Sequence, residues 1–174
     1  MRIGRLISAL VMTSAATLIP GLASAPAAHA TAGDVVCNGG FIEANAAPGM
    51  TFTTKTTQIT GQGDVGQCHS LSDPSVTGGT FTFQATVQGE CPNGGNGNGS
   101  GAITWNNGKT STIQGTFVVD QNQVGLSSVH VVSGEFQGDS GSFAGPITYL
   151  PWYECLFPTG VEYARSIINE GFLN

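Results

Sequence analysis

The strongest pattern in the chain is a strict alternation of apolar and polar residues from Thr80 to Gln88. The apolar positions hold phenylalanine, alanine and valine, and the positions between them hold threonine and glutamine. A period of two residues with one apolar face is typical of a half-buried antiparallel strand. The pattern therefore predicts a strand over this segment, with Phe81 and Phe83 facing the core.

Other segments alternate less strictly and are separated by turn-forming residues. Asn107-Gly108 is a strong hairpin signal, because both residues tolerate a positive φ. The segment Val161–Ile168 fits a helical face as well as a strand, and we favour a strand because the sequence around it is β-like. Six further strands are predicted over Val35–Glu43, Thr51–Thr60, Gly101–Asn106, Thr110–Val119, Val124–Gln137 and Ser142–Tyr149.

These elements predict an all-β fold. About eight short strands in one domain form a single antiparallel β-barrel or a sandwich, since either arrangement shields the edges that an open sheet exposes. The glycine-rich segment Cys91–Gly101 has the composition of a mobile loop, and we expect it to join two strands. A hollow core would suit a carrier of small molecules.

Residues 1–30 have the features of a signal peptide. Two arginines form a basic head, an apolar stretch follows over Leu6–Ile19, and Ala28-His29-Ala30 places small residues beside a cleavage site. The apolar stretch is shorter than the roughly 20 residues of a membrane-spanning helix. We therefore expect cleavage after Ala30 and a single secreted, extracellular β domain over residues 31–174.

The charge balance excludes several kinds of partner. The chain has 5 lysines and arginines and 11 acidic residues, so its formal net charge is −6. Two of the basic residues and none of the acids lie in the leader, so the processed chain is more acidic still. An acidic surface repels phosphate, and we expect no nucleic-acid partner and no membrane binding after the leader is removed.

The four cysteines are Cys37, Cys68, Cys91 and Cys155. An even number of cysteines in an exported chain predicts two disulfides. Three pairings are open, and we favour the sequential one, Cys37–Cys68 and Cys91–Cys155. No two cysteines have the spacing of a zinc site, so we expect no metal and no cofactor.

One motif is similar to the sequence around the nucleophile of trypsin-like serine proteases. It is Gly138-Asp139-Ser140-Gly141-Ser142, and His69 and Asp120 precede it in that family's order. The family's Ala-Ala-His-Cys sequence is absent around His69, and the processed chain is short for two catalytic barrels. The composition of the motif is that of a turn, so we assign no catalytic residue here.

A pair of carboxylates offers a second catalytic candidate. Glu135 and Asp139 lie near one predicted hairpin, and glycosidases use two such groups. An acidic chain supplies many carboxylate pairs by chance, so this pair also receives no catalytic assignment.

Aromatic residues are the predicted ligand contacts. Trp105 ends a predicted strand, and Trp152 and Tyr153 lie in a connection just before Cys155. Aromatic rings on a connection that a disulfide fixes are suited to stacking on a sugar or another flat ligand. The alternative is that these three rings cap the ends of the β domain.

Three tracts are similar to a group of small secreted β-rich proteins of actinobacteria. They are Gly101–Ser111, Gly134–Gly138, and Cys155 followed five residues later by Gly160-Val161. This resemblance covers most of the chain after the leader. It implies a β-rich fold and an extracellular location, and it implies no activity.

Together these features predict a non-enzymatic binding module for a glycan or a small flat ligand. One alternative is a structural protein of the cell envelope or matrix, which would have a filled interior and would self-associate. A secreted hydrolase, similar to a serine protease or a glycosidase, is the other alternative. The sequence indicates no oligomeric state.

Overall fold

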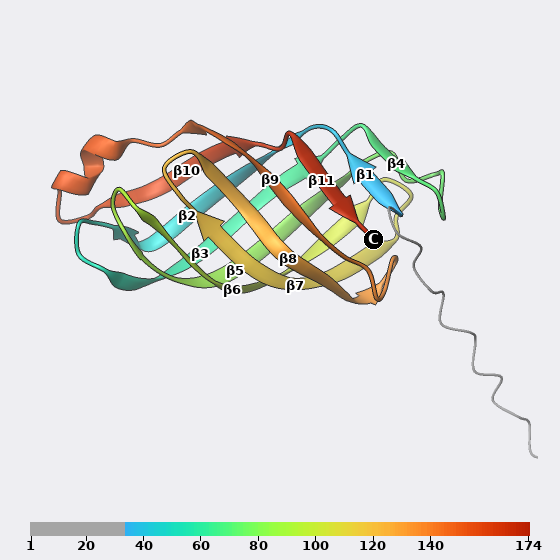
Figure 1. The fold of residues 1–174 in the computed structure, drawn as a ribbon, viewed down its shortest axis with the longest axis horizontal. Coiled ribbons are helices and arrows are strands. Elements are labelled where there is room, and N and C mark those ends of the chain that lie inside the picture. The colour runs from blue at the N-terminus through green and yellow to red at the C-terminus, as the bar shows by residue number, and fades with distance from the viewer. Residues whose placement is uncertain (1–33) are drawn as a thin grey trace, which may run out of the picture.

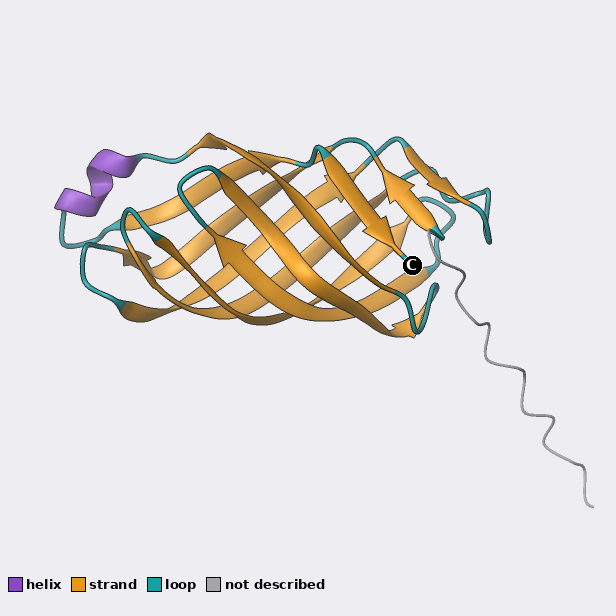
Figure 2. Cartoon of the chain, viewed as in Figure 1, coloured by secondary structure: helices purple, strands orange, loops and turns teal. Residues whose placement is uncertain are grey.

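The structure is a computed structural model that describes residues 34–174, so the predicted signal peptide lies outside the described residues. One antiparallel sheet makes up most of this part of the chain, together with one short 3-10 helix, η1 (Trp152–Leu156) (Figures 1 and 2). The prediction of an all-β fold is confirmed. The strands are β1 (Val35–Cys37), β2 (Gly40–Met50), β3 (Lys55–Val65), β4 (Cys68–Ser70), β5 (Gly79–Glu90), β6 (Gly94–Trp105), β7 (Thr110–Val119), β8 (Gln123–Gly134), β9 (Ser140–Tyr149), β10 (Val161–Ile167) and β11 (Glu170–Leu173).

The sheet closes on itself, because β10 pairs with β2 on one side and with β9 on the other. Between them the long strands β2, β3, β5, β6, β7, β8 and β9 are neighbours in that order (Figure 1). The β10–β9 contact has two residue pairs and a register shift, so the ring is irregular. β11 pairs with β9 beyond this contact, and β1 and β4 extend the sheet from β11. All the strands belong to one sheet, so the sandwich alternative is wrong.

The expected number of about eight strands is also wrong, because the structure has eleven. The predicted strand Val35–Glu43 is broken into β1 and β2, and the short strands β4 and β11 follow β3 and β10 after two-residue breaks. Beside two of these breaks, Gln67 and Gly40 have backbone φ values of +50° and +130°, which a regular strand does not allow. The favoured strand interpretation of Val161–Ile168 is confirmed by β10.

The glycine-rich segment is a strand, so the prediction of a mobile loop over Cys91–Gly101 is wrong. It forms most of β6, whose pairing with β5 and β7 is continuous. Glycines alternate with asparagine and serine here, and the glycines lie on the inward face, which continues into Ile103 and Trp105. A Cβ on Gly97 would overlap the backbone of β5. Glycine is required on this face because it lets the two strands lie close together.

Phenylalanine rings fill the space that other inward glycines leave empty. Phe83 is paired with Gly61 and Phe81 with Gly63 on the neighbouring strand β3. A Cβ on Gly61 would overlap the Phe83 ring, so ring and glycine are complementary in shape. The Phe83 ring also stacks on Phe117 of β7, over the glycine-rich strand β6 that lies between them, with 5.1 Å between the ring centroids. Large and small residues thus alternate around the ring of strands and produce a filled core.

The packing leaves little empty space inside the sheet. A void of about 30 Å³ lies between Ile59, Phe117 and Leu150, near the end of the sheet that carries η1. Pockets for small organic ligands have volumes of roughly 300–1,000 Å³. A filled core of this kind does not support the hypothesis of an interior carrier.

The ring–glycine contact gives a stability prediction. We expect Gly61→Ala to lower the free energy of unfolding by about 1–3 kcal/mol, because the new methyl group competes with the Phe83 ring and with the Glu43 carbonyl oxygen, 2.5 Å from its position. Gly66→Ala is the matched control, since no atom lies within 4 Å of its Cβ position. Urea unfolding with both disulfides intact measures the difference. Equal losses in the two variants would contradict the proposed packing.

Candidate ligand-binding surface

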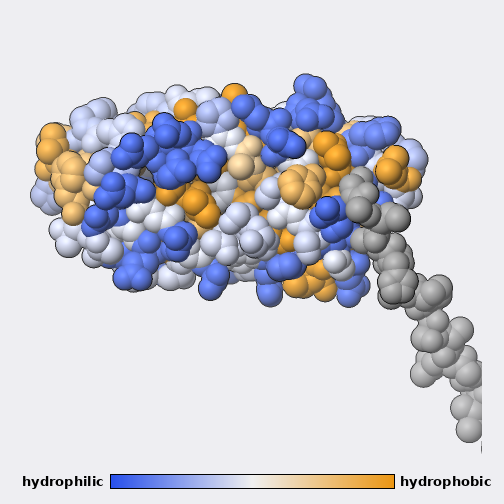
Figure 3. All heavy atoms as spheres, viewed as in Figure 1, coloured by the Kyte–Doolittle hydropathy of each residue, from blue (hydrophilic) through white to orange (hydrophobic). Residues whose placement is uncertain are grey.

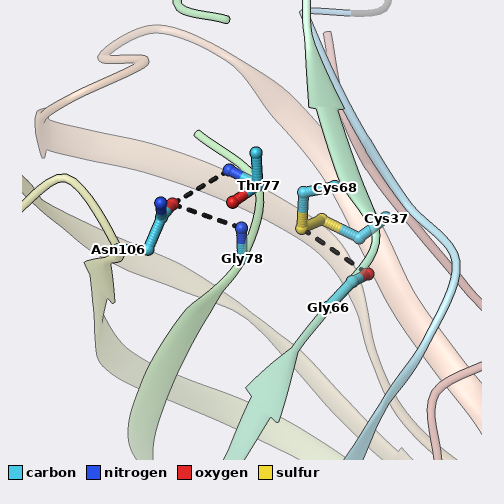
Figure 4. Close-up of a disulfide and its surroundings, with 6 residues drawn as sticks. All are labelled: Cys37, Gly66, Cys68, Thr77, Gly78 and Asn106. Carbon is cyan, nitrogen blue, oxygen red and sulfur yellow. Dashed lines mark hydrogen bonds between the residues drawn. A yellow bond between two sulfur atoms is a disulfide. The ribbon is translucent and has the colours of Figure 1, made fainter. Parts of the chain in front are cut away.

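The two disulfides lie at opposite ends of the sheet, and their pairing is the one favoured from the sequence. Cys37–Cys68 joins the paired strands β1 and β4, and Cys91–Cys155 joins the end of β5 to η1. Figure 4 shows the first disulfide near Asn106, whose Oδ1 accepts hydrogen bonds from the backbone N–H groups of Thr77 and Gly78. The first disulfide therefore links two short strands to each other beside one end of the ring, and the second fixes η1 to the other end.

Trp105 belongs to the core at the end that carries β1 and β4. Only 1% of its surface is exposed, and its indole N–H donates a hydrogen bond of 2.8 Å to the Ser111 hydroxyl. The Phe136 ring packs edge-on against it, with 5.3 Å between centroids. Trp105 offers no open ring face to a ligand, and its position matches the alternative in which the rings cap the ends of the domain.

A charged network covers the same end. The Lys109 ammonium lies 2.8 Å from an Asp73 carboxylate oxygen and 3.1 Å from a Glu135 oxygen, and so joins three connections between strands. Its hydrogen bonds to these carboxylates raise the pKa of Lys109, and its hydrogen bond to Asp73 lowers the pKa of that carboxyl below its usual range. The cation is engaged within the protein, which makes this end a structural closure.

The other end carries exposed aromatic and aliphatic residues on η1 and on Phe157, which follows it. Tyr153, Leu156 and Phe157 are 63%, 74% and 55% exposed, while Trp152 is half-buried. Figure 3 shows apolar surface gathered at the end of the molecule where η1 lies. We call these four residues the η1 tip. It is a convex apolar surface, and the bond from Cys155 to Cys91 fixes it to the sheet.

The local sequence explains why the tip is exposed. η1 is a single 3-10 turn, in which the N–H of Glu154 donates to the carbonyl of Pro151 and the N–H of Phe157 donates to that of Glu154. In a 3-10 helix, side chains three residues apart lie above one another. Buried Cys155 therefore shares the inner side with Trp152, and the Tyr153 side chain lies on the outer side with that of Leu156.

The structure brings Trp152 and Tyr153 together but separates both from Trp105. Trp105 is the last residue of β6, whereas Cys91, which anchors the tip, lies beside the first residue of that strand. A strand of this length spans roughly 35–40 Å. The three predicted ligand contacts therefore do not form one surface.

The predicted protease residues are not assembled. His69 lies on β4, and Asp120 follows β7 at the end of the sheet that carries η1. The partner of Ser140 is instead His130, whose Nδ1 lies 2.7 Å from the serine Oγ. Sequence reasoning missed this contact, which follows from the direct pairing of these residues on β8 and β9. In the described chain no carboxylate hydrogen-bonds to His130, so the pair lacks the third member of a triad.

The predicted carboxylate pair is divided between two environments. Glu135 is paired with Lys109, while Asp139 has no exposed surface. Neither carboxylate oxygen of Asp139 has a hydrogen-bond partner among the residues that the structure describes. Burial, with a smaller contribution from the charge of Asp34, raises the pKa of Asp139 to about 6. A buried group of this kind does not flank an open site as a glycosidase carboxylate would.

Residues 34–174 contain no cluster of three or more His, Cys, Asp or Glu side chains placed to hold a metal ion. No helix in this range has the length and apolar character needed to cross a membrane.

Comparison of the chain with known protein families, with curated proteins and with solved structures found no match.

Asp139 gives a prediction about pH. Its pKa in the folded protein, about 6, lies above the ordinary value of 3.8, so the folded state binds this proton more tightly than the unfolded state does. The contribution of Asp139 to the free energy of unfolding is present in full below the ordinary pKa, and it is lost as the pH rises through 6. We expect the free energy of unfolding to be higher at pH 5 than at pH 7.5, by about 1–2 kcal/mol from this group. Urea unfolding at constant ionic strength measures it.

Asp139→Asn is the variant that assigns the effect. An amide cannot ionise, so we expect the variant to lose most of this pH dependence and to be more stable than the parent protein at pH 7.5. The same slope in both proteins between pH 5 and 7.5 would show that another group is responsible.

Proposed function

We propose that this chain is an extracellular, non-enzymatic binding module that holds the ring face of a neutral glycan or a similar flat ligand against the η1 tip. The observation that carries the proposal is the exposure of three large apolar side chains, Tyr153, Leu156 and Phe157, on one short turn. Apolar groups gathered on a surface mark sites of interaction, and aromatic rings provide flat contact area for sugar rings.

The rigidity of the tip supports this proposal. The disulfide from Cys155 to Cys91 holds η1 in place, and Trp152 packs against the buried cluster that contains these two cysteines. A contact surface that is already ordered loses little conformational entropy when a ligand binds. The two disulfides also fit an extracellular location.

Charge supports an uncharged ligand. The chain has a formal net charge of −6, and the residue at the middle of the turn is Glu154. Of the few basic side chains, Lys109 is held by Asp73 and Glu135, and Arg165 lies over the Phe41 ring with Glu43 3.8 Å away. Anionic glycans would meet an acidic protein whose described ion pairs already engage two of its cations.

Calorimetric titration with neutral oligosaccharides of glucose, xylose and N-acetylglucosamine tests the proposal. We expect binding by at least one of them, and we expect Tyr153→Ala to weaken it about tenfold through loss of ring contact. Leu71→Ala is the matched control, because Leu71 is 68% exposed and lies in the connection after β4, at the other end of the sheet. Equal affinity of both variants, or no binding by any of the sugars, would refute the tip as the site.

A structural role in an envelope or matrix is the second candidate, and the filled core favours it. Sedimentation velocity separates the two candidates, since a structural protein would self-associate with increasing concentration.

The hydrolase alternative predicts that a fluorophosphonate probe labels Ser140 and that Ser140→Ala abolishes the labelling. We expect no labelling, because the His130–Ser140 pair has no orienting carboxylate among its described hydrogen bonds.

A further inference from the structure

The outward side of four neighbouring strands carries rows of polar side chains. β3, β5, β6 and β7 pair with one another without any register shift, so their outward residues align across the strands. We call the twenty aligned positions the polar face. From β3 to β7 its five rows are Thr56, Gln88, Asn96 and Val118; Gln58, Thr86, Asn98 and Thr116; Thr60, Gln84, Ser100 and Gln114; Gln62, Thr82, Ala102 and Thr112; and Asp64, Thr80, Thr104 and Thr110.

The composition of the polar face is nearly uniform. Seventeen of its twenty residues are threonine, glutamine, asparagine or serine, and Asp64 is the one that carries a charge. The face has no aromatic residue, no lysine and no arginine. The side chains of this large area therefore offer hydroxyl and amide groups, and Asp64 provides its single charge.

Two open hollows lie next to each other along this face. The first has a volume of about 470 Å³ and is lined by Gln58, Gln84, Asn98 and Gln114, among others. The second, of about 390 Å³, is lined by residues of the next rows, including Gln62 and Asp64, and also by Phe41 of β2, which lies outside the face. The hollows therefore follow the strand direction, in which the face extends over roughly 25–30 Å.

The amides of the first hollow are available for binding. Within the described chain the side chains of Gln84, Asn98 and Gln114 form no hydrogen bond, whereas Gln58 accepts one of 3.0 Å from Thr86. An amide presents two donor hydrogens and an acceptor oxygen, and a sugar hydroxyl also donates and accepts. The chemistry of the hollow therefore matches a ligand rich in hydroxyl groups.

We infer that the polar face binds an extended, uncharged polysaccharide chain that lies along β5 and β6. A nucleic acid or an anionic glycan would require basic side chains, which the face lacks. The centres of protein–protein interfaces are enriched in aromatic residues and arginine, and the twenty positions of the face have none. The polar face is separate from the η1 tip, and the inference rests on different observations. Either proposal can therefore be wrong while the other is right.

The test is native electrophoresis through gels that contain hydroxyethylcellulose, neutral arabinoxylan or, as an anionic control, alginate. We expect at least one neutral polymer to slow the protein, and the double variant Gln84→Ala/Gln114→Ala to weaken the derived affinity about tenfold. Gln137→Ala removes an exposed glutamine from the β8–β9 connection and should have no effect. Circular dichroism melting confirms that all variants remain folded.

The comparison with the tip identifies which proposal fails. We expect Tyr153→Ala to keep its affinity for the polymer within about twofold. Retardation that Tyr153→Ala removes and the double variant retains would overturn the inference and leave the tip as the site. Retardation in alginate, or none in either neutral gel, would overturn it as well.

A second copy of the chain is the competing occupant of the polar face. Sedimentation velocity of the parent protein and of Gln84→Glu/Gln114→Glu tests it, because introduced carboxylates would repel each other across a symmetric contact. A dimer that this variant disperses would overturn the inference and assign the face to self-association. A monomer in both proteins supports it.

Discussion

Every long strand of this protein has a hydrogen-bonded neighbour on both sides, and the rest of the structure depends on that closure. The pairing of β10 with β2 and β9 leaves the long strands without a free edge. The alternation of side chains then divides each strand into one row that faces a small interior and one row that faces solvent. The interior has a fixed cross-section, so each bulky inward ring, such as Phe83, requires a small residue beside it, such as Gly61.

The two ends of the ring are closed by different chemistry. At one end Trp105 is buried under a network in which Lys109 joins Asp73 and Glu135. At the other end the covalent bond from Cys91 to Cys155 holds a short turn whose outer side chains remain in contact with water. The Lys109 cation of the first end is paired within the protein, whereas the apolar side chains of the second end remain exposed to water. This asymmetry is why the tip, and not Trp105, is the better candidate for an aromatic contact.

Local sequence patterns predicted the elements whose two faces differ in polarity. Thr80–Gln88 and Thr110–Val119 fall within β5 and β7, because apolar and polar residues alternate there. Residues 94–100 of β6 were missed because glycine occupies the inward positions there and gives no apolar signal, whereas the rest of β6 lies within the predicted strand Gly101–Asn106. The breaks at Gly40 and Gln67 depend on how β1 and β4 pair with distant segments, which local composition does not encode. The same holds for the candidate site. Local sequence does not distinguish Trp105 from Trp152 as a ligand contact, and it is the strand topology that buries Trp105.

The circular order of the strands also sets the order in which the chain can fold. β1 pairs with β11 and β2 pairs with β10, so the beginning and the end of the described chain are neighbours in space (Figure 1). Contacts between residues so far apart in sequence are slow to form. During synthesis or export β1 and β2 can pair with β4 and β3, but each lacks its second neighbour until residues 161–173 have emerged. The ring is therefore completed last by its C-terminal segment, and a chain shortened there would leave β1 and β2 as open edges exposed to neighbouring molecules.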